Sequence, residues 1–276
     1  MPADDTLIET GAEIAEQAGA AFESEDAVAT KEVDPQFRIG AVLGRGFSIL
    51  FRNIVRFGLL GLIFYTPFVA MVVTGTASEA AFDENPWLAA LFLLSLFAFP
   101  FLYLLLNATV VYCTIQNLHG ARATLGAGLR RGLATIFPVL GTGVLVAFVV
   151  VLGFVALVIP GFIILVMVWV AIPVAVIERR TPIEAMSRSI DLTDGYRWRV
   201  LGVVLLVILM NAAVNVVGDM VPIASMVGDA PATIAIHALV DVFSALLFAV
   251  VSAVGYHDLR AVNEGTDGDQ IAAVFD

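Results

Sequence analysis

The stretch PVLGTGVLVAFVVVLGFVALVIPGFIILVMVWVAIPVAVI, residues 138–177, decides the fold class. It contains no charged residue. It is long enough for two crossings of a hydrocarbon core roughly 30 Å thick, since a helix rises about 1.5 Å per residue. Pro160 and Gly161 form a turn signal inside the stretch, so we expect a third span to end and a fourth to begin there. A re-entrant pair of helices is the alternative.

Four further segments are apolar over the length that a membrane-spanning helix needs. Together they predict an all-α integral membrane protein with six transmembrane helices, near residues 54–75, 87–113, 138–159, 161–177, 200–220 and 232–256. Hydrophobic residues make up 60% of the chain, charged residues 14%, and the mean hydropathy is +0.95. A soluble domain carries about 25% charged residues. This chain lacks the polar residues to cover its surface, so we expect lipid to be its solvent.

Basic residues are confined to alternate connections between the predicted spans. All 14 precede or open the first span, lie between spans two and three or four and five, or follow the sixth. The remaining connections carry only acidic residues among their charges. Because basic loops stay on the cytoplasmic side, we expect both termini in the cytoplasm and the protein in the plasma (inner) membrane.

The N-terminal segment is strongly acidic. Residues 1–36 hold ten acidic residues against one base, Lys31, out of a formal net charge of −11. This pattern predicts a largely disordered tail, with a partner-binding amphipathic helix around Leu7–Phe22 as the alternative. It argues against nucleic-acid binding, and it does not match a cleavable signal peptide. We therefore expect an acidic tail over residues 1–36, a membrane domain over 37–260 and a short cytoplasmic tail over 261–276.

Three basic-side segments resemble one another, which indicates an internal repeat. Each has an apolar stripe at helical spacing; the stripes are Ile39, Leu43, Phe47 and Leu50, then Leu125, Leu129, Leu133 and Ile136, then Ile183, Met186 and Ile190. Aligning Ile39, Leu125 and Ile183 also superposes Ala41, Ala127 and Ala185. Each segment leads into an odd-numbered span. The simplest interpretation is three transmembrane hairpins, each preceded by a cytoplasmic, interfacial amphipathic helix.

The third segment has the clearest helix boundaries. Thr181 is placed to cap a helix, Glu184 completes the capping box, and Asp194–Gly195 ends the helix. Surface helices that lie in the membrane interface are the ordinary interpretation of these segments. A more specific interpretation is that the arginines of these helices recognise lipid headgroups. The candidate interfacial or lipid-facing residues are Arg38, Arg45, Arg52, Arg122, Arg131, Arg188 and Trp198.

Several short motifs resemble a known family. They are Ile159-Pro160-Gly161-Phe162, Ile172–Glu178, Glu184–Ser189, Thr193–Trp198, and Gly255–Arg260 with Glu264-Gly265. In order and spacing they are similar to the glycerophosphoryl diester phosphodiesterase membrane-domain family, over residues 37–270. In that family the membrane region precedes a soluble catalytic barrel, for which the 20 residues after the last predicted span leave no room. The resemblance implies a polytopic helical membrane protein without the phosphodiesterase activity.

Polar residues within the last two spans are the main candidate site. Asn211 and Asn215 share one face of span five, and His237, Asp241 and Ser244 share one face of span six. A charged residue at the centre of a membrane costs at least about 2.5–3.5 kcal/mol, so we expect Asp241 to face protein or water. Three interpretations are open: these residues fasten the two spans by hydrogen bonds, they form a proton- or substrate-coupled site, or they lie near a water-filled mouth.

The sequence offers little sign of reaction chemistry. Cys113 is the single cysteine, and no cluster has the spacing of metal ligands or of a catalytic nucleophile with its base. We therefore expect no cofactor, no metal and no enzymatic activity. The favoured function is a non-catalytic membrane protein that organises lipids or a partner protein at the cytoplasmic face, with a homo-oligomer as a further option. A small transporter or channel that uses the polar residues of the last two spans is the alternative.

Overall fold

The computed structural model describes residues 37–75, 83–121, 124–220 and 231–264. Within these ranges every regular element is a helix, which confirms the all-α class. Six stretches are long and apolar enough to cross a membrane: Ile54–Thr74, Pro86–Leu118, Ile136–Ala156, Val158–Glu178, Arg197–Val216 and Ile234–Glu264. Phe97 and Val155 are 76% and 78% exposed, as expected of a surface that lipid covers. The chain is therefore a polytopic membrane protein.

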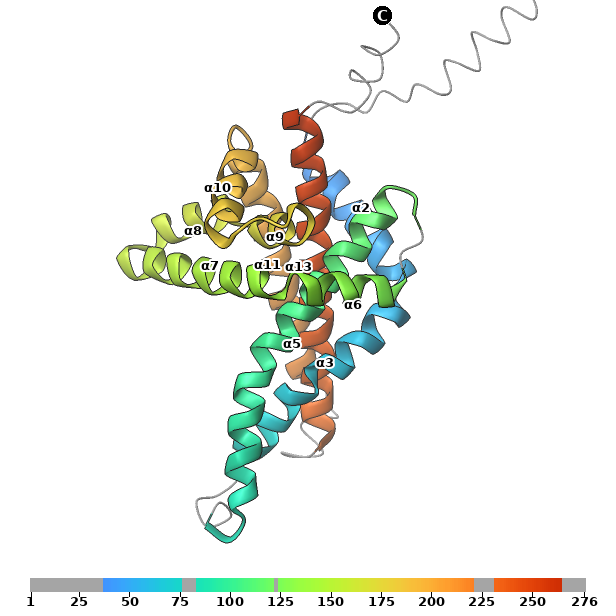
Figure 1. Cartoon of the computed structure of the whole chain (residues 1–276), viewed down its shortest axis with the longest axis vertical. Helices are drawn as coiled ribbons and strands as arrows, with labels where there is room; N and C mark the ends of the chain where they lie inside the picture. Colours follow the sequence, from blue (N-terminus) through green and yellow to red (C-terminus); the bar gives the residue numbers. More distant parts are fainter. Residues whose placement is uncertain (1–36, 76–82, 122–123, 221–230, 265–276) are drawn as a thin grey trace, which may run out of the picture. The chain divides into compact units, whose positions relative to one another are not determined.

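Figure 1 labels the helices along the chain. The six spans are α3 (Ile54–Gly75), α5 (Pro86–Leu118), α7 (Ile136–Ala156), α8 (Val158–Met167) with α9 (Ala171–Glu178), α11 (Arg197–Met220) and α13 (Pro231–Glu264). Three short helices precede the odd-numbered spans: α2 (Ile39–Arg52), α6 (Leu125–Ala134) and α10 (Pro182–Thr193). The helix predicted around Leu7–Phe22 lies outside the described residues, as do residues 265–276.

The third and fourth spans meet at Leu157 rather than at Pro160–Gly161. Leu157 has an extended backbone (φ −167°, ψ 154°) and separates α7 from α8. Pro160 lies in the first turn of α8, where its missing N–H leaves no helical hydrogen bond unmade. Gly161 packs on Phe154, because an added Cβ would lie 2.5 Å from that ring. The Pro-Gly pair thus starts a helix, and the glycine allows close packing of α8 on α7.

The predicted boundaries of α10 agree with the structure. The backbone N–H of Thr181 donates to Glu184 Oε2 at 3.1 Å, which is one half of the capping box. This hydrogen bond lowers the pKa of the Glu184 carboxyl. Its contribution to stability is therefore present above the ordinary glutamate pKa and is lost as the pH falls through the lowered value. At the other end Gly195 takes a left-handed backbone (φ 76°), which ends the helix.

Small residues form much of the buried face of the short helices. An added Cβ at Gly128 of α6 would lie 2.6 Å from Cys113 Sγ, and one at Gly132 would lie 2.9 Å from Leu105 Cδ1, both on α5. Leu133, from the stripe predicted to be apolar and interfacial, is 50% exposed. The backbone of α6 therefore lies directly against α5 at its glycines.

The other two short helices, α2 and α10, also bury small residues against neighbouring helices. In α2, Gly46 packs on α13, where an added Cβ would lie 3.1 Å from Val251 Cγ2. In α10, Ala185 and Ser189 are buried, and Ser189 Oγ donates to the Met167 carbonyl at 2.8 Å. Ile183, from the predicted stripe of α10, is 74% exposed.

These buried positions correct the predicted register of the repeat. The positions recur at intervals of four residues as Val42, Gly46 and Leu50, then Gly128, Gly132 and Ile136, then Ala185, Ser189 and Thr193. The predicted alignment of the first two segments agrees with this register. The third was placed wrongly by one residue, because Ala185 is buried whereas Ala41 and Ala127 are exposed. In the corrected register Arg45, Arg131 and Arg188 are equivalent.

The repeats contact one another in a cycle. We define them as the first repeat (α2, α3, α5), the second (α6 to α9) and the third (α10, α11, α13). The short helix of each repeat packs on the even-numbered span of the repeat before it: α6 on α5, α10 on α9, and α2 on α13. The odd-numbered spans follow the same rule, with α7 on α5, α11 on α8 and α3 on α13. The even-numbered spans α5, α9 and α13 contact one another, so they form the centre of this pseudo-threefold arrangement.

Two expectations from the sequence stay predictions. One is that the short helices lie in the membrane interface, and the other is that the spans cross the membrane as three hairpins.

The contact between α6 and α5 leads to a stability prediction. Gly128→Val should lower the free energy of unfolding by about 1–3 kcal/mol, because the added methyl groups overlap Cys113 and Thr109. Gly126→Val is the matched control, since nothing lies within 4 Å of a Cβ at Gly126. The melting temperature of the detergent-solubilised protein measures both. Equal effects of the two substitutions would contradict the close packing of α6 on α5.

Candidate functional site

A pocket of about 290 Å³ lies among four of the spans. Its lining residues come from α3, α5, α11 and α13; they are Tyr65, Tyr103, Asn211, Asp241, Ser244, Ala245 and Phe248. On α13, Asp241, Ser244, Ala245 and Phe248 are at i, i+3, i+4 and i+7, which places them on one helix face. The structure thus brings together Asn211, Asp241 and Ser244, three of the five residues singled out in the sequence.

Two polar atoms at this pocket have no hydrogen-bond partner among the residues that the structure describes. Asn211 Oδ1 and Ser244 Oγ are buried from solvent and unpaired. Most buried polar atoms in proteins are hydrogen-bonded, so unpaired ones call for an explanation such as a missing ligand or water. Asp241 is half-buried beside them. That Asp241 faces protein or water stays a prediction.

The other two polar residues of the predicted site do not line the pocket. Asn215 Nδ2 donates to the Asn211 backbone carbonyl at 2.8 Å, one turn back on the same helix. His237 lies one turn before Asp241, is half-buried and interacts with Asp241 electrostatically. Whether these residues fasten α11 to α13 by side-chain hydrogen bonds stays a prediction.

Two tyrosines of the pocket were not identified in the sequence. Tyr65 and Tyr103 belong to an aromatic cluster, in which the Tyr65 ring centre lies 5.4 Å from Phe99 and 6.5 Å from Tyr103. Tyrosine carries a polar hydroxyl that usually has a partner when it is buried. The signal was therefore present: each tyrosine lies in the middle of an otherwise apolar span.

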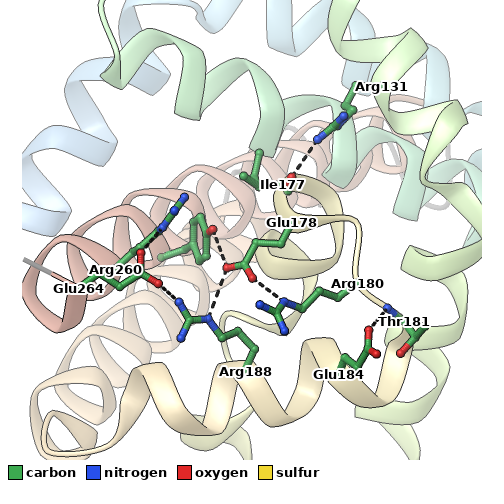
Figure 2. Close-up of polar contacts among 10 residues, drawn as sticks. Arg131, Ile177, Glu178, Arg180, Thr181, Glu184, Arg188, Arg260 and Glu264 are labelled. Atoms are coloured by element: carbon green, nitrogen blue, oxygen red, sulfur yellow. Dashed lines mark hydrogen bonds and ion pairs between the residues drawn. The ribbon is translucent and has the colours of Figure 1, made fainter. Parts of the chain in front are cut away.

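A second polar cluster joins the C-terminal ends of α9 and α13 to the middle of α10, as Figure 2 shows. Glu178 is its centre: Tyr256 Oη donates to Glu178 Oε1 at 3.0 Å, and Arg188 Nε lies 3.6 Å from the same oxygen. Arg180 Nε donates to Glu178 Oε2 at 2.6 Å. Arg188 also pairs with Glu264, whose other carboxylate oxygen accepts from Arg260 Nε at 2.6 Å. These charges are paired with one another, so the cluster joins α13 to α9 and α10, although the buried Arg188 Nε has no hydrogen-bond partner within the described residues.

The equivalent arginines of the other repeats make similar internal contacts. Arg45 of α2 pairs with Asp258 of α13. Arg131 of α6 donates to the Val176 carbonyl at 3.1 Å and the Ile177 carbonyl at 2.8 Å. These carbonyls lie in the last turn of α9, where cations are favourable. Burial lowers the pKa of Arg131, although a guanidinium stays charged in a protein.

The arginines predicted to face lipid are thus of several kinds. Arg45, Arg131 and Arg188 bind other parts of the protein. Arg38 and Arg52 are exposed, and Trp198 is 86% exposed. Arg122 lies outside the described residues.

The remaining titratable groups do not form a metal centre in the part of the chain that is described. The rings of His119 and His257 lie 5.5 Å apart, where the ends of α5 and α13 meet. His257 Nδ1 is 3.4 Å from Asp258 Oδ1, which also belongs to the Arg45 pair.

Comparisons with protein-family models, with curated proteins and with solved structures find no match to this chain. The resemblance to the glycerophosphoryl diester phosphodiesterase membrane-domain family therefore stays a prediction.

The pocket can be tested by its access to water. In a chain with Cys113→Ala, we expect Ser244→Cys to react with a charged methanethiosulfonate reagent, because residue 244 lines the pocket. Ser252→Cys is the matched control, since Ser252 lies on the same helix and is 1% exposed. Mass spectrometry of the intact protein gives the extent of labelling. Labelling of both variants, or of neither, would contradict a water-accessible pocket at Ser244.

Proposed function

We propose that this polytopic membrane protein is a small transporter that binds a polar solute in the Asp241 pocket. The observation that carries the proposal is a pocket between spans with one carboxylate and two buried, unpaired oxygen atoms, Asn211 Oδ1 and Ser244 Oγ. Ionisable residues inside membrane spans are costly, and they commonly mark ion or substrate pathways.

The arrangement of the repeats supports this proposal. Tyr65 and Tyr103 belong to the first repeat, and Asn211 and Asp241 belong to the third. The pocket therefore lies at the boundary between two repeats. Transporters commonly bind substrate between structural repeats, because a rocking motion of one repeat against another then opens the site to either side.

Organisation of lipids is a second candidate function. A groove of about 510 Å³ lies between α8 and α11, and its lining is almost entirely apolar apart from Arg197; the residues are Ile159, Phe162, Ile163, Val166, Arg197, Trp198, Leu201 and Leu205. Arg197 and Trp198 are in the first turn of α11, and the leucines follow along the helix. The groove suits an acyl chain whose anionic headgroup meets Arg197. The exposed leucine and isoleucine of α6 and α10 support an interfacial position for these helices.

The proposals that remain rest on the sequence pattern. The distribution of basic residues supports a plasma-membrane protein with both termini in the cytoplasm. A partner protein, a homo-oligomer, the absence of enzymatic activity and the family resemblance stay predictions.

The transport proposal predicts that solute flux is lost when Asp241 is replaced. In proteoliposomes, the protein should carry at least one member of a labelled panel of small cationic, neutral and anionic solutes. Asp241→Asn should abolish that flux with little change in folding, because the two side chains have nearly the same shape. Asn215→Ala should retain the flux, since Asn215 does not line the pocket. A panel without any flux that depends on Asp241 would refute the proposal.

The lipid proposal predicts that bound phospholipid is lost when Arg197 is replaced. Arg197→Gln should reduce the anionic phospholipid that stays bound during purification, because the groove loses its positive charge. Its ion pair with the exposed Asp194, at 3.1 Å, contributes little to folding. Arg52→Gln is the control, as Arg52 is exposed and outside the groove. Native mass spectrometry measures the retained lipid, and unchanged retention in Arg197→Gln would exclude this role for the groove.

A further inference from the structure

We infer that the ligand of the Asp241 pocket is a small organic ammonium ion; this inference rests on the proposed solute site and names its substrate class. Three independent features of the lining point to the same chemistry. They are its charge, its hydrogen-bonding atoms and its aromatic rings.

The charge of the lining is negative. Among the described residues that line the pocket, Asp241 is the only one with an acidic carboxyl group, and none is an arginine, a lysine or a histidine. His237 interacts with Asp241 but lies outside the lining. A cation that enters the pocket gains an ion pair with the Asp241 carboxylate, whereas the same carboxylate would repel an anion.

The unpaired atoms of the pocket are oxygens that accept hydrogen bonds. Asn211 Oδ1 is an acceptor only, and Ser244 Oγ accepts as well as donates. The Asp241 carboxylate is a third acceptor when it is ionised. Both oxygens are buried in this structure, so a ligand reaches them only when the Asn211 and Ser244 side chains rotate. A ligand that then satisfies all three acceptors must supply several donors from a compact group. A primary ammonium supplies three N–H donors and carries the required positive charge.

The aromatic rings select an organic cation over a metal ion. Tyr65, Tyr103 and Phe248 line the same space, and cations of amines are attracted to the faces of aromatic rings. The pocket volume of about 290 Å³ is near the lower end of small-molecule sites, which measure about 300–1,000 Å³. A bare metal ion would leave most of this volume empty and would need more oxygen ligands. A small amine with a short carbon chain fits both the volume and the rings.

Binding of defined probes to the full chain in lipid nanodiscs tests the inference. The probes are butylammonium, choline, 3,3-dimethylbutan-1-ol, which is the neutral analogue of choline, and sodium chloride alone. Isothermal titration should show butylammonium binding most tightly. Choline should bind more weakly because its nitrogen has no N–H. The neutral alcohol and sodium should show no saturable binding.

Variants then locate the binding to the pocket. Asp241→Asn should weaken butylammonium binding about ten-fold or more, the size expected for a hydrogen bond to a charged group. Asn211→Ala should also weaken it, whereas Asn215→Ala, the same change one turn away on α11, should leave it unchanged. If Asp241→Asn does not fold, Ser244→Ala provides the second test of a lining oxygen, and it too should weaken binding.

The outcomes separate this inference from the proposed transporter. If the neutral alcohol or sodium binds in an Asp241-dependent way and the ammonium ions do not, the ammonium inference is wrong while a solute site at Asp241 stands. If Asn211→Ala and Asn215→Ala weaken butylammonium binding equally, the inference is also wrong, because binding would then not depend on which residue lines the pocket. If no probe binds and no solute of the flux panel depends on Asp241, both the inference and the transporter proposal fall.

Discussion

The close approach of each short helix to a span of the preceding repeat is the contact on which the rest of the structure depends. Within a membrane the hydrophobic effect does not drive helices together, so van der Waals packing and polar contacts must hold them. Gly46, Gly128 and Gly132 bring backbones within direct contact distance of α13 and α5, and Ser189 adds a hydrogen bond to Met167. An arginine directly precedes the small residue in each repeat: Arg45, Arg131 and Arg188. This pairing of a small residue with a neighbouring arginine sets both the distance between the helices and their register.

The sequence allowed the spans and their number to be predicted, because length and apolarity alone decide whether a helix can cross a membrane. It also placed Asn211, Asp241 and Ser244 together, since helical spacing and matching depth are visible in a single chain. It did not allow the third repeat to be aligned, because alignment followed large apolar residues whereas packing follows small ones such as Ala185 and Ser189. Tyr65 and Tyr103 could not be joined to the pocket either. Their contribution depends on α3 and α5 packing against α13, which no local pattern reveals.

The two polar regions of the protein differ in how well their groups are satisfied. Around Glu178, Tyr256 and Arg180 donate hydrogen bonds to the carboxylate, and Arg188 forms an ion pair with it, although the buried Arg188 Nε has no hydrogen-bond partner among the described residues. Around Asp241, buried oxygens of Asn211 and Ser244 are unpaired. The charges around Glu178 are paired with one another, whereas the described lining of the Asp241 pocket contains no basic residue, so a ligand can supply a partner there. Arg45, Arg131 and Arg188, which the sequence suggested as lipid contacts, bind other parts of the protein, and the less conspicuous pocket is the better candidate for function.

The cyclic contacts between repeats bear on how such a protein arises. A cycle has no first member: α2 meets α13 by the same rule by which α6 meets α5, although the first pair is far apart in the chain and the second is adjacent. Three separate copies of one ancestral repeat would make every contact of this kind between neighbouring subunits, as a closed trimer does. Gene triplication followed by fusion would then preserve the assembly while freeing each copy to diverge. The polar pocket between the first and third repeats is the kind of asymmetry that only a fused chain can acquire, because identical subunits would have to change at all three boundaries at once.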